Sequence, residues 1–217
     1  MQNIFEAVKN NPLFLEITYD EFAPLLTCLS ARTSYYKKNE IIISEGDRVT
    51  FAGVIISGCV KIIKEDERGN VSMFTELPEA EIFGDILVCA GITHSPVMIF
   101  AAENTEILKI NGQKIISLCD NACPSHKKLL NNILKLVAKK NFALNRKIEV
   151  LSKRTTREKI LCFFDLYSNG TKKFAIPFNR EEMAQYLCVD RSAMSNELCK
   201  MRDEGMLKFK KNKFEIL

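Results

Sequence analysis

Residues Ser125 to Leu151 contain neither glycine nor proline, and apolar side chains recur among them at alternating intervals of four and three residues. Asn141 is the one polar member of this series. A sustained repeat of this kind is typical of a helix that pairs along a coiled-coil seam, and Pro124 is tolerated in the first turn. We therefore predict a dimerisation helix over residues 124–152. Its predicted interface consists of Leu130, Leu134, Val137, Asn141, Leu144 and Ile148.

A second apolar stripe lies beside this seam and consists of Leu129, Ile133, Leu136 and Ala143. One stripe can pack on the rest of the chain while the other pairs with a second copy. The alternative, in which both stripes serve one intramolecular core, stays open. A lone Asn at a seam position typically fixes the register and the number of paired helices, at some cost in stability.

The chain before this helix has a different residue pattern. Short β-rich runs fill the stretch from Ser34 to Ile110, namely EIIIS, FAGVIIS, CVKIIKE, VSMFTEL, VMIFAA and EILKI. Many short strands separated by glycine-containing turns are typical of a sandwich or barrel, and we predict no helix among them. Short amphipathic helices are expected within Asn3–Leu29, and Asn111 can cap another short helix.

Charge is divided between the two halves of the chain. Residues 1–110 carry 9 Lys or Arg and 16 Asp or Glu, a net charge of −7, whereas residues 111–217 carry 22 and 11, a net charge of +11. An acidic half joined to a basic half indicates two functions, with the basic half facing a polyanion.

Neither a targeting segment nor a membrane span is expected. The start MQNIFEAVKNNP has no apolar core, and the longest uncharged stretch, Ile86–Ala102, is short for a span and contains Gly91 and Pro96. The eight cysteines lie mostly in apolar segments such as ILCFF and YLCVD. We therefore expect reduced, buried thiols in a cytoplasmic protein.

The segment Phe178–Met206 has the pattern of two helices joined by the short turn Cys188-Val189. Asn179 and Asp190 can each cap a helix, and the small Ala184 permits a close crossing. The second helix is predicted to turn inward Ala193, Met194, Leu198 and Met201, and outward Arg191, Ser192, Ser195 and Asn196. Side chains near the start of a recognition helix read base edges in the major groove, so the four outward residues are predicted base readers.

A basic hairpin is predicted over residues 207–217, around Lys211-Asn212-Lys213. Lys210 and Lys211 suit contact with DNA phosphates, and Arg180 is a further predicted DNA contact. The alternative for the whole segment is a solvated amphipathic helix pair followed by an edge hairpin. The short turn, the small residue, the polar outward face and the basic hairpin together favour DNA binding.

The stretch NREEMAQYLCVDRSAMSNELCKMRDEGML resembles the helix-turn-helix of the Crp–Fnr family of bacterial regulators. The upstream runs YYKKNEIIISEGD, VIISGCVKIIKE and IFGDI resemble the cyclic-nucleotide-binding-type β-roll of that family, so the resemblance covers nearly the whole chain. Ser192 and Asn196 depart from the glutamate and the arginine usual at these positions. Cys188 replaces the turn glycine of the family, which strains the backbone if φ is positive there.

The resemblance implies an α+β fold with an N-terminal β-roll of the double-stranded β-helix or jelly-roll type, flanking helices, a long dimerisation helix and a C-terminal winged helix-turn-helix. The expected domains are a cyclic-nucleotide-binding-like sensor over residues 1–123, the dimerisation helix over 124–152 and the winged helix-turn-helix over 153–217. The implied function is a sequence-specific DNA-binding transcription regulator of the bacterial cytoplasm. Its implied partners are a second copy of the chain, a palindromic operator in double-stranded DNA, and RNA polymerase.

The resemblance also indicates an effector site in the roll. In cyclic-nucleotide-binding members, a Gly-Glu pair holds the ribose and an Arg-Ser pair holds the cyclic phosphate. This chain carries Gly84-Asp85 and His94-Ser95 there, and no arginine occurs between Arg68 and Arg146. Because a cyclic phosphate needs a fixed cation such as arginine, cyclic AMP is not the expected ligand. The predicted site for a small effector of unknown identity consists of Gly84, Asp85, Ile86, His94, Ser95 and Val97.

Cysteine and histidine chemistry leaves one alternative open. The close N-terminal cysteines of the iron–sulfur sensors of the family are missing, since only Cys28 precedes Cys59, and neither His94 nor His126 has a supporting haem motif. Cys119 and Cys123 can form a redox switch or half of a metal site. The sequence spacing offers no third and fourth ligand, so buried helix cysteines are the simpler interpretation. We expect no metal.

No enzyme and no catalytic residue are expected, because the chain has no nucleophile elbow, Gly-rich phosphate loop or catalytic His–acid pair. Two other functions stay open. One is a coiled-coil interaction protein that does not bind DNA, and the other is a redox-responsive regulator that acts through its cysteines. Salt-dependent DNA binding separates the first from a transcription regulator.

Overall fold

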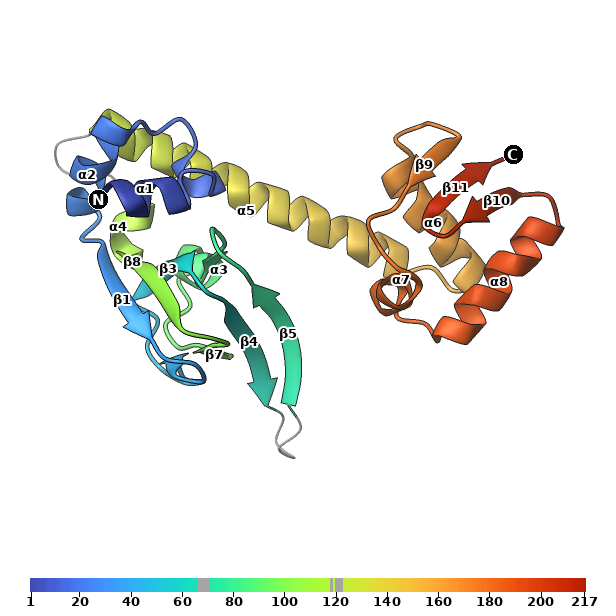
Figure 1. Cartoon of the computed structure of the whole chain (residues 1–217), viewed down its shortest axis with the longest axis horizontal. Helices are drawn as coiled ribbons and strands as arrows, with labels where there is room; N and C mark the ends of the chain where they lie inside the picture. Colours follow the sequence, from blue (N-terminus) through green and yellow to red (C-terminus); the bar gives the residue numbers. More distant parts are fainter. Residues whose placement is uncertain (66–70, 118, 120–122) are drawn as a thin grey trace. The chain divides into compact units, whose positions relative to one another are not determined.

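The computed structural model describes residues 1–65, 71–117, 119 and 123–217 (Figure 1). It contains two compact units, Met1–Ala138 and Lys139–Leu217, and each is described by itself. Helix α5, Pro124–Leu151, begins in the first unit and ends in the second. The long helix predicted from the Gly- and Pro-free stretch is therefore confirmed almost to the residue.

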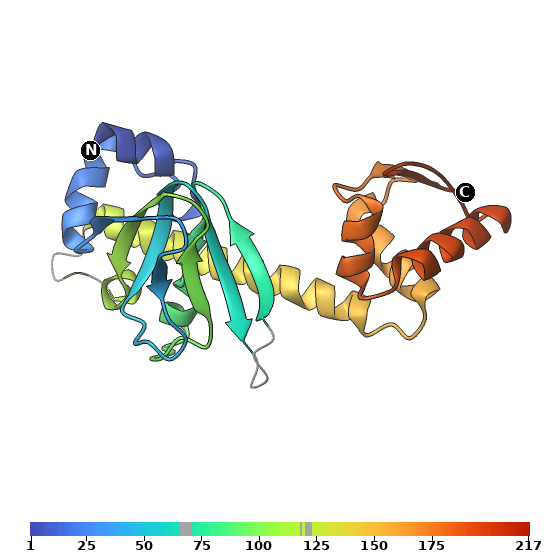
Figure 2. The ribbon, with the colours of Figure 1, turned by 60° about the horizontal axis from the view of Figure 1, so that its bottom comes forward.

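Two four-stranded antiparallel sheets form the roll of the first unit (Figures 1 and 2). The first sheet has the order β1 (Arg32–Tyr36), β8 (Thr105–Asn111), β3 (Phe51–Ser57) and β6 (Ile82–Phe83). The second has the order β2 (Ile41–Ile43), β7 (Met98–Ala101), β4 (Val60–Glu65) and β5 (Val71–Leu77). The predicted α+β fold with an N-terminal β-roll is confirmed.

Apolar side chains from both sheets fill the interior of the roll. Ile55, Phe83, Ile99 and Ile107 are among the buried members of this cluster. The ring of Phe83 lies directly against Gly53 on the neighbouring strand, where a Cβ atom would lie 2.2 Å from the ring. Only glycine at position 53 therefore allows Phe83 to occupy this part of the interior.

Helices cover the other face of the first sheet. They are α1 (Gln2–Val8), the 3₁₀ turn Pro12–Phe14, α2 (Tyr19–Cys28), α4 (Gly112–Ile116) and the first half of α5. Because side chains alternate along a strand, Val54 of β3 packs with these helices while its neighbour Ile55 points into the roll. Three members of the second stripe of α5 are buried here, Leu129, Ile133 and Leu136. The fourth, Ala143, lies beyond the sensor unit and is exposed in the single chain.

One short helix, α3 (Asp85–Cys89), interrupts the stretch in which we predicted strands alone. Gly84 precedes it with φ 75°, and this left-handed conformation lets the chain leave β6 and turn at once into the helix. The run DILVC is apolar enough to be mistaken for a strand, because short apolar runs do not distinguish the two.

Besides the end of α5, the second unit contains three helices and a small sheet. It contains α6 (Thr156–Ser168), β9 (Lys173–Ala175), α7 (Arg180–Leu187), α8 (Arg191–Asp203), β10 (Leu207–Lys210) and β11 (Lys213–Ile216). The sheet has the antiparallel order β10, β11, β9. Phe163 and Phe164 of α6 are fully buried at its centre, together with Leu187, Met194 and Leu198 of α7 and α8. The predicted helix pair and basic hairpin are confirmed.

The turn between α7 and α8 shows the predicted strain. Cys188 has φ 50° and ψ 54°, a left-handed conformation that a side chain disfavours.

The expectation of buried cysteines was wrong, because Cys188 is exposed and the other seven are half-buried. The prediction that Ala193 faces inward was also wrong, since it is exposed.

Within the described residues, no helix combines the length and the apolar character that a membrane crossing requires.

Candidate nucleic-acid interface and sensor site

Helix α8 begins where it does because Asp190 caps it. The carboxylate accepts the backbone N–H of Ala193 at 2.9 Å and the hydroxyl of Ser192 at 2.5 Å. These bonds, the one from Ser192 first, lower the pKa of Asp190. An ionised cap at a helix N-terminus is favoured by the helix dipole, so the first turn of α8 is held in a fixed conformation.

The predicted base readers occupy the start of α8. Arg191, Ser192 and Asn196 are exposed, whereas Ser195 is half-buried. The side chain of Arg191 is 64% exposed, and its Nε lies 3.6 Å from Oε2 of Glu181 on α7. This exposed pair is weak and leaves the arginine available for another partner.

Lys200 shares the exposed face of α8 but was not singled out from the sequence. It follows Asn196 by four residues and Ser192 by eight, a spacing that places all three on one side of a helix. The helical periodicity could have identified it. It adds a cation in the last turn of the helix, on the same face.

An ion-pair network connects α8 to α6. The guanidinium of Arg157 donates to Glu197 at 2.5 Å and to the two carboxylate oxygens of Glu204 at 2.7 and 2.9 Å. These bonds, those to Glu204 first, raise the pKa of Arg157. Bidentate arginine–carboxylate contacts fix orientation as well as distance. The network therefore orients α8 on the core of the unit.

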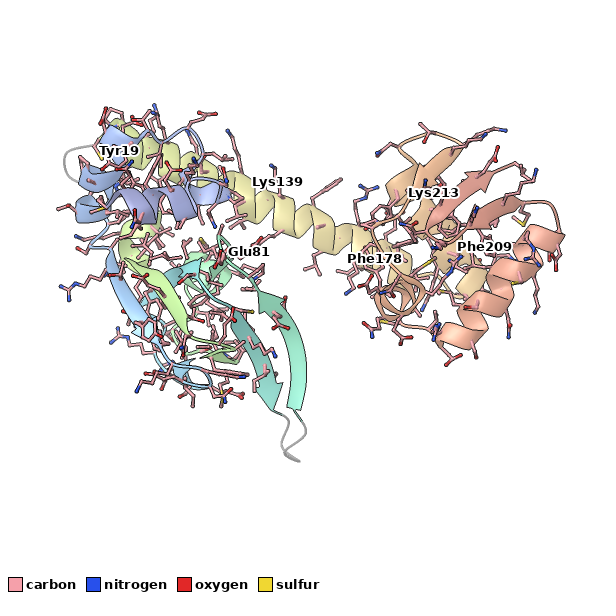
Figure 3. The ribbon with its side chains drawn as sticks, in the orientation of Figure 1. Tyr19, Glu81, Lys139, Phe178, Phe209 and Lys213 are labelled. Carbon is pink, nitrogen blue, oxygen red and sulfur yellow. The ribbon has the colours of Figure 1, made fainter. Side chains whose placement is uncertain are left out.

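The hairpin of β10 and β11 carries the predicted phosphate contacts at its tip. Lys210 is paired with Lys213 across the hairpin, and Lys210, Lys211 and Lys213 are exposed. Figure 3 labels Lys213 and Phe209 on the two strands. Asn212 anchors the turn, since its amide donates to the carbonyl of Ile176 at 3.0 Å. The lysines are thus presented on a fixed turn.

Arg180 is half-buried and lies against the hairpin of β10 and β11, which forms the wing of this unit. Its guanidinium lies 4.9 Å from the ring centre of Phe209 and 5.0 Å from that of Phe214. Burial lowers the pKa of this guanidinium. The side chain stabilises the wing through cation–π contacts, and its predicted contact with DNA stays a prediction.

In the sensor unit, two loops that are distant in sequence run side by side. The backbone N–H of Gly46 donates to Ser95 at 2.8 Å, that of Ser95 to Asp47 at 2.8 Å, and that of Val49 to Thr93 at 2.9 Å. This pairing places Arg48 directly opposite His94. Both residues are exposed. No local sequence signal could join them, so the arginine beside the predicted effector loop was missed.

The six predicted effector residues lie at the two ends of the loop region around α3. Gly84 and Asp85 begin α3, where Asp85 is buried and Ile86 is 52% exposed. His94 is exposed and its Nδ1 lies 3.0 Å from the hydroxyl of Thr93. Ser95 is buried and donates to the carbonyl of Val97 at 2.7 Å.

A cavity of about 400 Å³ opens beside this region. Its lining includes Arg48, Thr93, Asn111 and Gln113. None of the six predicted effector residues lines it, although Thr93 adjoins His94. The effector site therefore stays a prediction, with Arg48 as an additional candidate at its edge.

The predicted seam of α5 divides into two parts. Leu134, Leu144 and Ile148 are 70%, 58% and 54% exposed, and Asn141 beside them accepts a hydrogen bond from Asn145 at 2.8 Å. Leu130 and Val137 are half-buried, and Val137 packs against the sensor core. The exposed part is an apolar face without a partner in the described residues of one chain.

Cys119 and Cys123 do not lie in a helix, contrary to the simpler interpretation of the sequence. They lie between α4 and α5, and the fold brings Cys28 and His126 to them. The backbone N–H of Cys123 and then the ring of His126 lower the pKa of the Cys119 thiol to about 6. Desolvation, followed by the proximity of Cys119, raises the pKa of Cys28 to about 11.

Comparison with known proteins matches both units. Residues 33–122 match the family model of the cyclic nucleotide-binding domain, and residues 149–217 match that of the Crp-like helix-turn-helix domain. No curated protein matches the chain.

Solved structures also match, at low identity. The catabolite activator protein of Thermus thermophilus is 19% identical with a TM-score of 0.57, over 95% of this chain and 93% of that one. DNR from Pseudomonas aeruginosa is 15% identical with a TM-score of 0.51, over 98% and 92%. CLP from Xanthomonas campestris is 16% identical with a TM-score of 0.52, over 89% and 97%. At these identities the likeness shows the fold alone.

Proposed function

Because the chain belongs to the Crp–Fnr family of DNA-binding transcription regulators, we propose that its homodimer reads a palindromic operator through helix α8. The observation that carries the proposal is the start of α8. Its polar exposed face stands on a buried apolar core, and a lysine-bearing hairpin belongs to the same unit. A helix of this kind enters the major groove, and the hairpin contacts the flanking backbone.

The residues divide by the contact each can make. Arg191 is the one predicted base reader that is long and charged enough to bind guanine in bidentate fashion. Lys210 and Lys211 lie at the tip of the hairpin and suit phosphate. Two recognition helices related by two-fold symmetry would contact half-sites roughly 10 base pairs apart. RNA polymerase is a further proposed partner, on the ground of the family alone.

Arg191→Ala should weaken binding to the preferred operator much more than binding to random DNA. A good bidentate contact discriminates between bases by roughly 1–3 kcal/mol. Lys210→Ala is the matched control, because loss of a phosphate contact should weaken all sequences alike and reduce the salt slope by about one unit. The measurement is a binding selection from a random library, followed by salt titrations of the wild type and both variants.

Two outcomes would contradict this assignment. In one, the selection recovers no palindromic site. In the other, Arg191→Ala loses specific and random binding equally, and α8 is then not the base reader. Salt-independent or absent DNA binding would favour the interaction protein instead.

We further propose that the sensor unit binds a small effector at the loops that contain Gly84, Asp85, Ile86, His94, Ser95 and Val97. Arg48 supports this proposal because it stands beside His94 and adds a cation at the edge of the predicted site. Apolar side chains fill the space between the two sheets, and Phe83 in particular occupies volume that a ligand the size of a nucleotide would need there.

Cyclic AMP should bind weakly or not at all to the purified chain. An exposed arginine in a loop holds a phosphate less firmly than one fixed inside an apolar pocket, where the interaction is stronger. Isothermal calorimetry measures this directly. Tight, saturable binding that Arg48→Ala abolishes would identify Arg48 as the missing cation and overturn the prediction.

A further inference from the structure

Four potential metal ligands meet at one point of the sensor unit. The sulfurs of Cys28, Cys119 and Cys123 and a ring nitrogen of His126 all lie within 4.8 Å of one another. Cys28 is the last residue of α2, the other two cysteines lie between α4 and α5, and His126 is in the first turn of α5. The fold thus supplies the third and fourth ligands that sequence spacing could not provide.

The spacing of the ligand atoms suits a single ion. The sulfurs of Cys119 and Cys123 are 3.5 Å apart, and the sulfur of Cys28 is 3.4 Å from Nδ1 of His126. Bonds of about 2.3 Å to sulfur and about 2.0 Å to nitrogen place the corners of a tetrahedral zinc site roughly 3.5–3.8 Å apart. Small movements of the sulfurs would complete such a tetrahedron.

His126 is oriented as a ligand. It is 1% exposed, and its Nε2 lies 2.8 Å from the backbone carbonyl of Lys114 on α4. A carbonyl oxygen can only accept a hydrogen bond, so Nε2 carries the proton. In the neutral form of this ring, which is the form that binds metal, Nδ1 directs its lone pair at the cysteines. Metal-binding histidines regularly donate their second N–H to a carbonyl in this way.

A backbone hydrogen bond also joins Cys123 to Cys119. The N–H of Cys123 donates to the sulfur of Cys119 at 3.4 Å. A hydrogen bond of this kind stabilises the thiolate, which is the form of cysteine that binds metal.

From this geometry we propose that Cys28, Cys119, Cys123 and His126 bind one Zn²⁺ ion per chain in a closed, structural site. Three thiolates and one imidazole form one of the common structural zinc sites, and soft sulfur ligands in tetrahedral geometry select zinc. An iron–sulfur cluster binds its cysteines through different irons and would need the ligands farther apart. The ion would join α2 to the start of α5.

The test uses the full chain, with Zn²⁺ and Co²⁺ as probes. The wild type purified without chelator should contain one zinc per chain by plasma mass spectrometry. Replacement by Co²⁺ should give the visible bands of a tetrahedral ion and the charge-transfer bands of three thiolates. Cys119→Ser and His126→Ala should each weaken Zn²⁺ binding by roughly a hundredfold or more, because loss of outer hydrogen-bond partners alone costs about 10–100-fold.

Cys59→Ser is the matched control, since Cys59 is a half-buried cysteine of the same unit outside the cluster, and it should keep the zinc. The cobalt spectrum of the wild type decides the question even if a variant fails to fold. Four results would overturn the proposal. They are no stoichiometric zinc after titration, a cobalt spectrum without thiolate bands, iron with acid-labile sulfide, and a Cys119–Cys123 disulfide in the intact mass in place of metal.

Discussion

Replacing Leu134 and Leu144 together by lysine should convert the proposed dimer into a monomer at micromolar concentration. Both side chains are more than half exposed on a single chain and belong to the predicted seam. Burying a leucine is worth about 1.5–3 kcal/mol, and a two-fold dimer would bury four of them, so the loss is on the order of 6 kcal/mol or more. This corresponds to roughly four powers of ten in the dissociation constant.

Sedimentation velocity measures the change in mass, and operator titration measures its consequence. A monomer presents one recognition helix, so its affinity for the operator should fall toward its affinity for random DNA, a difference of on the order of a thousandfold or more. Val137 is left intact because it packs against the sensor core, and its replacement would also damage the monomer.

Phe142→Lys is the control for the double replacement of Leu134 and Leu144. Phe142 is 64% exposed on the same helix but lies one residue beyond the seam position of Asn141. The variant adds a lysine to α5 without touching the seam, and the dimer should persist. A dimer that survives the double replacement, or one that Phe142→Lys breaks equally, would show that the seam is assigned wrongly.

The elements of the fold that the sequence predicted well are those with a regular period or a strong cap. Asn179 and Asp190 accept backbone N–H groups at the starts of α7 and α8, as their positions indicated. The Gly- and Pro-free stretch became α5. These features depend on neighbours within one or two helical turns, and such local preferences can be derived from one sequence.

The features that the sequence could not reveal are contacts between distant segments. Arg48 and His94 face each other because two loops pair through backbone hydrogen bonds, which carry no side-chain signature. Cys28 and His126 are 98 residues apart and meet only after α2 packs beside α5. Neither juxtaposition follows from spacing along the chain.

Two smaller errors have local physical causes. Ala193 carries too little apolar surface to decide which way it faces, and the neighbouring Met194 takes the buried position. The predicted base readers omitted Lys200, because the prediction stopped at the first turns of α8. Its exposed position four residues after Asn196 makes it a further candidate for DNA contact.

Phe164→Ala should destabilise the winged-helix unit more than any surface replacement. Phe164 is fully buried, with ring centres of Phe214 and Phe174 at 4.4 and 5.3 Å. Truncation of a buried phenylalanine costs about 3–5 kcal/mol, through lost burial and the cavity it leaves. Hydrogen exchange of the α7 and α8 amides in the full chain should therefore accelerate by roughly two to four powers of ten, for those amides that exchange only when the unit opens.

The same exchange experiment contains its own controls. Peptides from β3 and β8 should exchange as in the wild type, because Phe164 belongs to the core of the second unit alone. Phe142→Ala removes an equally large ring from an exposed site on that unit, and its effect should stay within about 0.5 kcal/mol. If α7 and α8 keep wild-type protection in Phe164→Ala, the aromatic cluster does not carry the stability assigned to it. If β3 and β8 lose protection to the same degree, the two units unfold together, and the stability of the DNA-binding unit depends directly on that of the sensor.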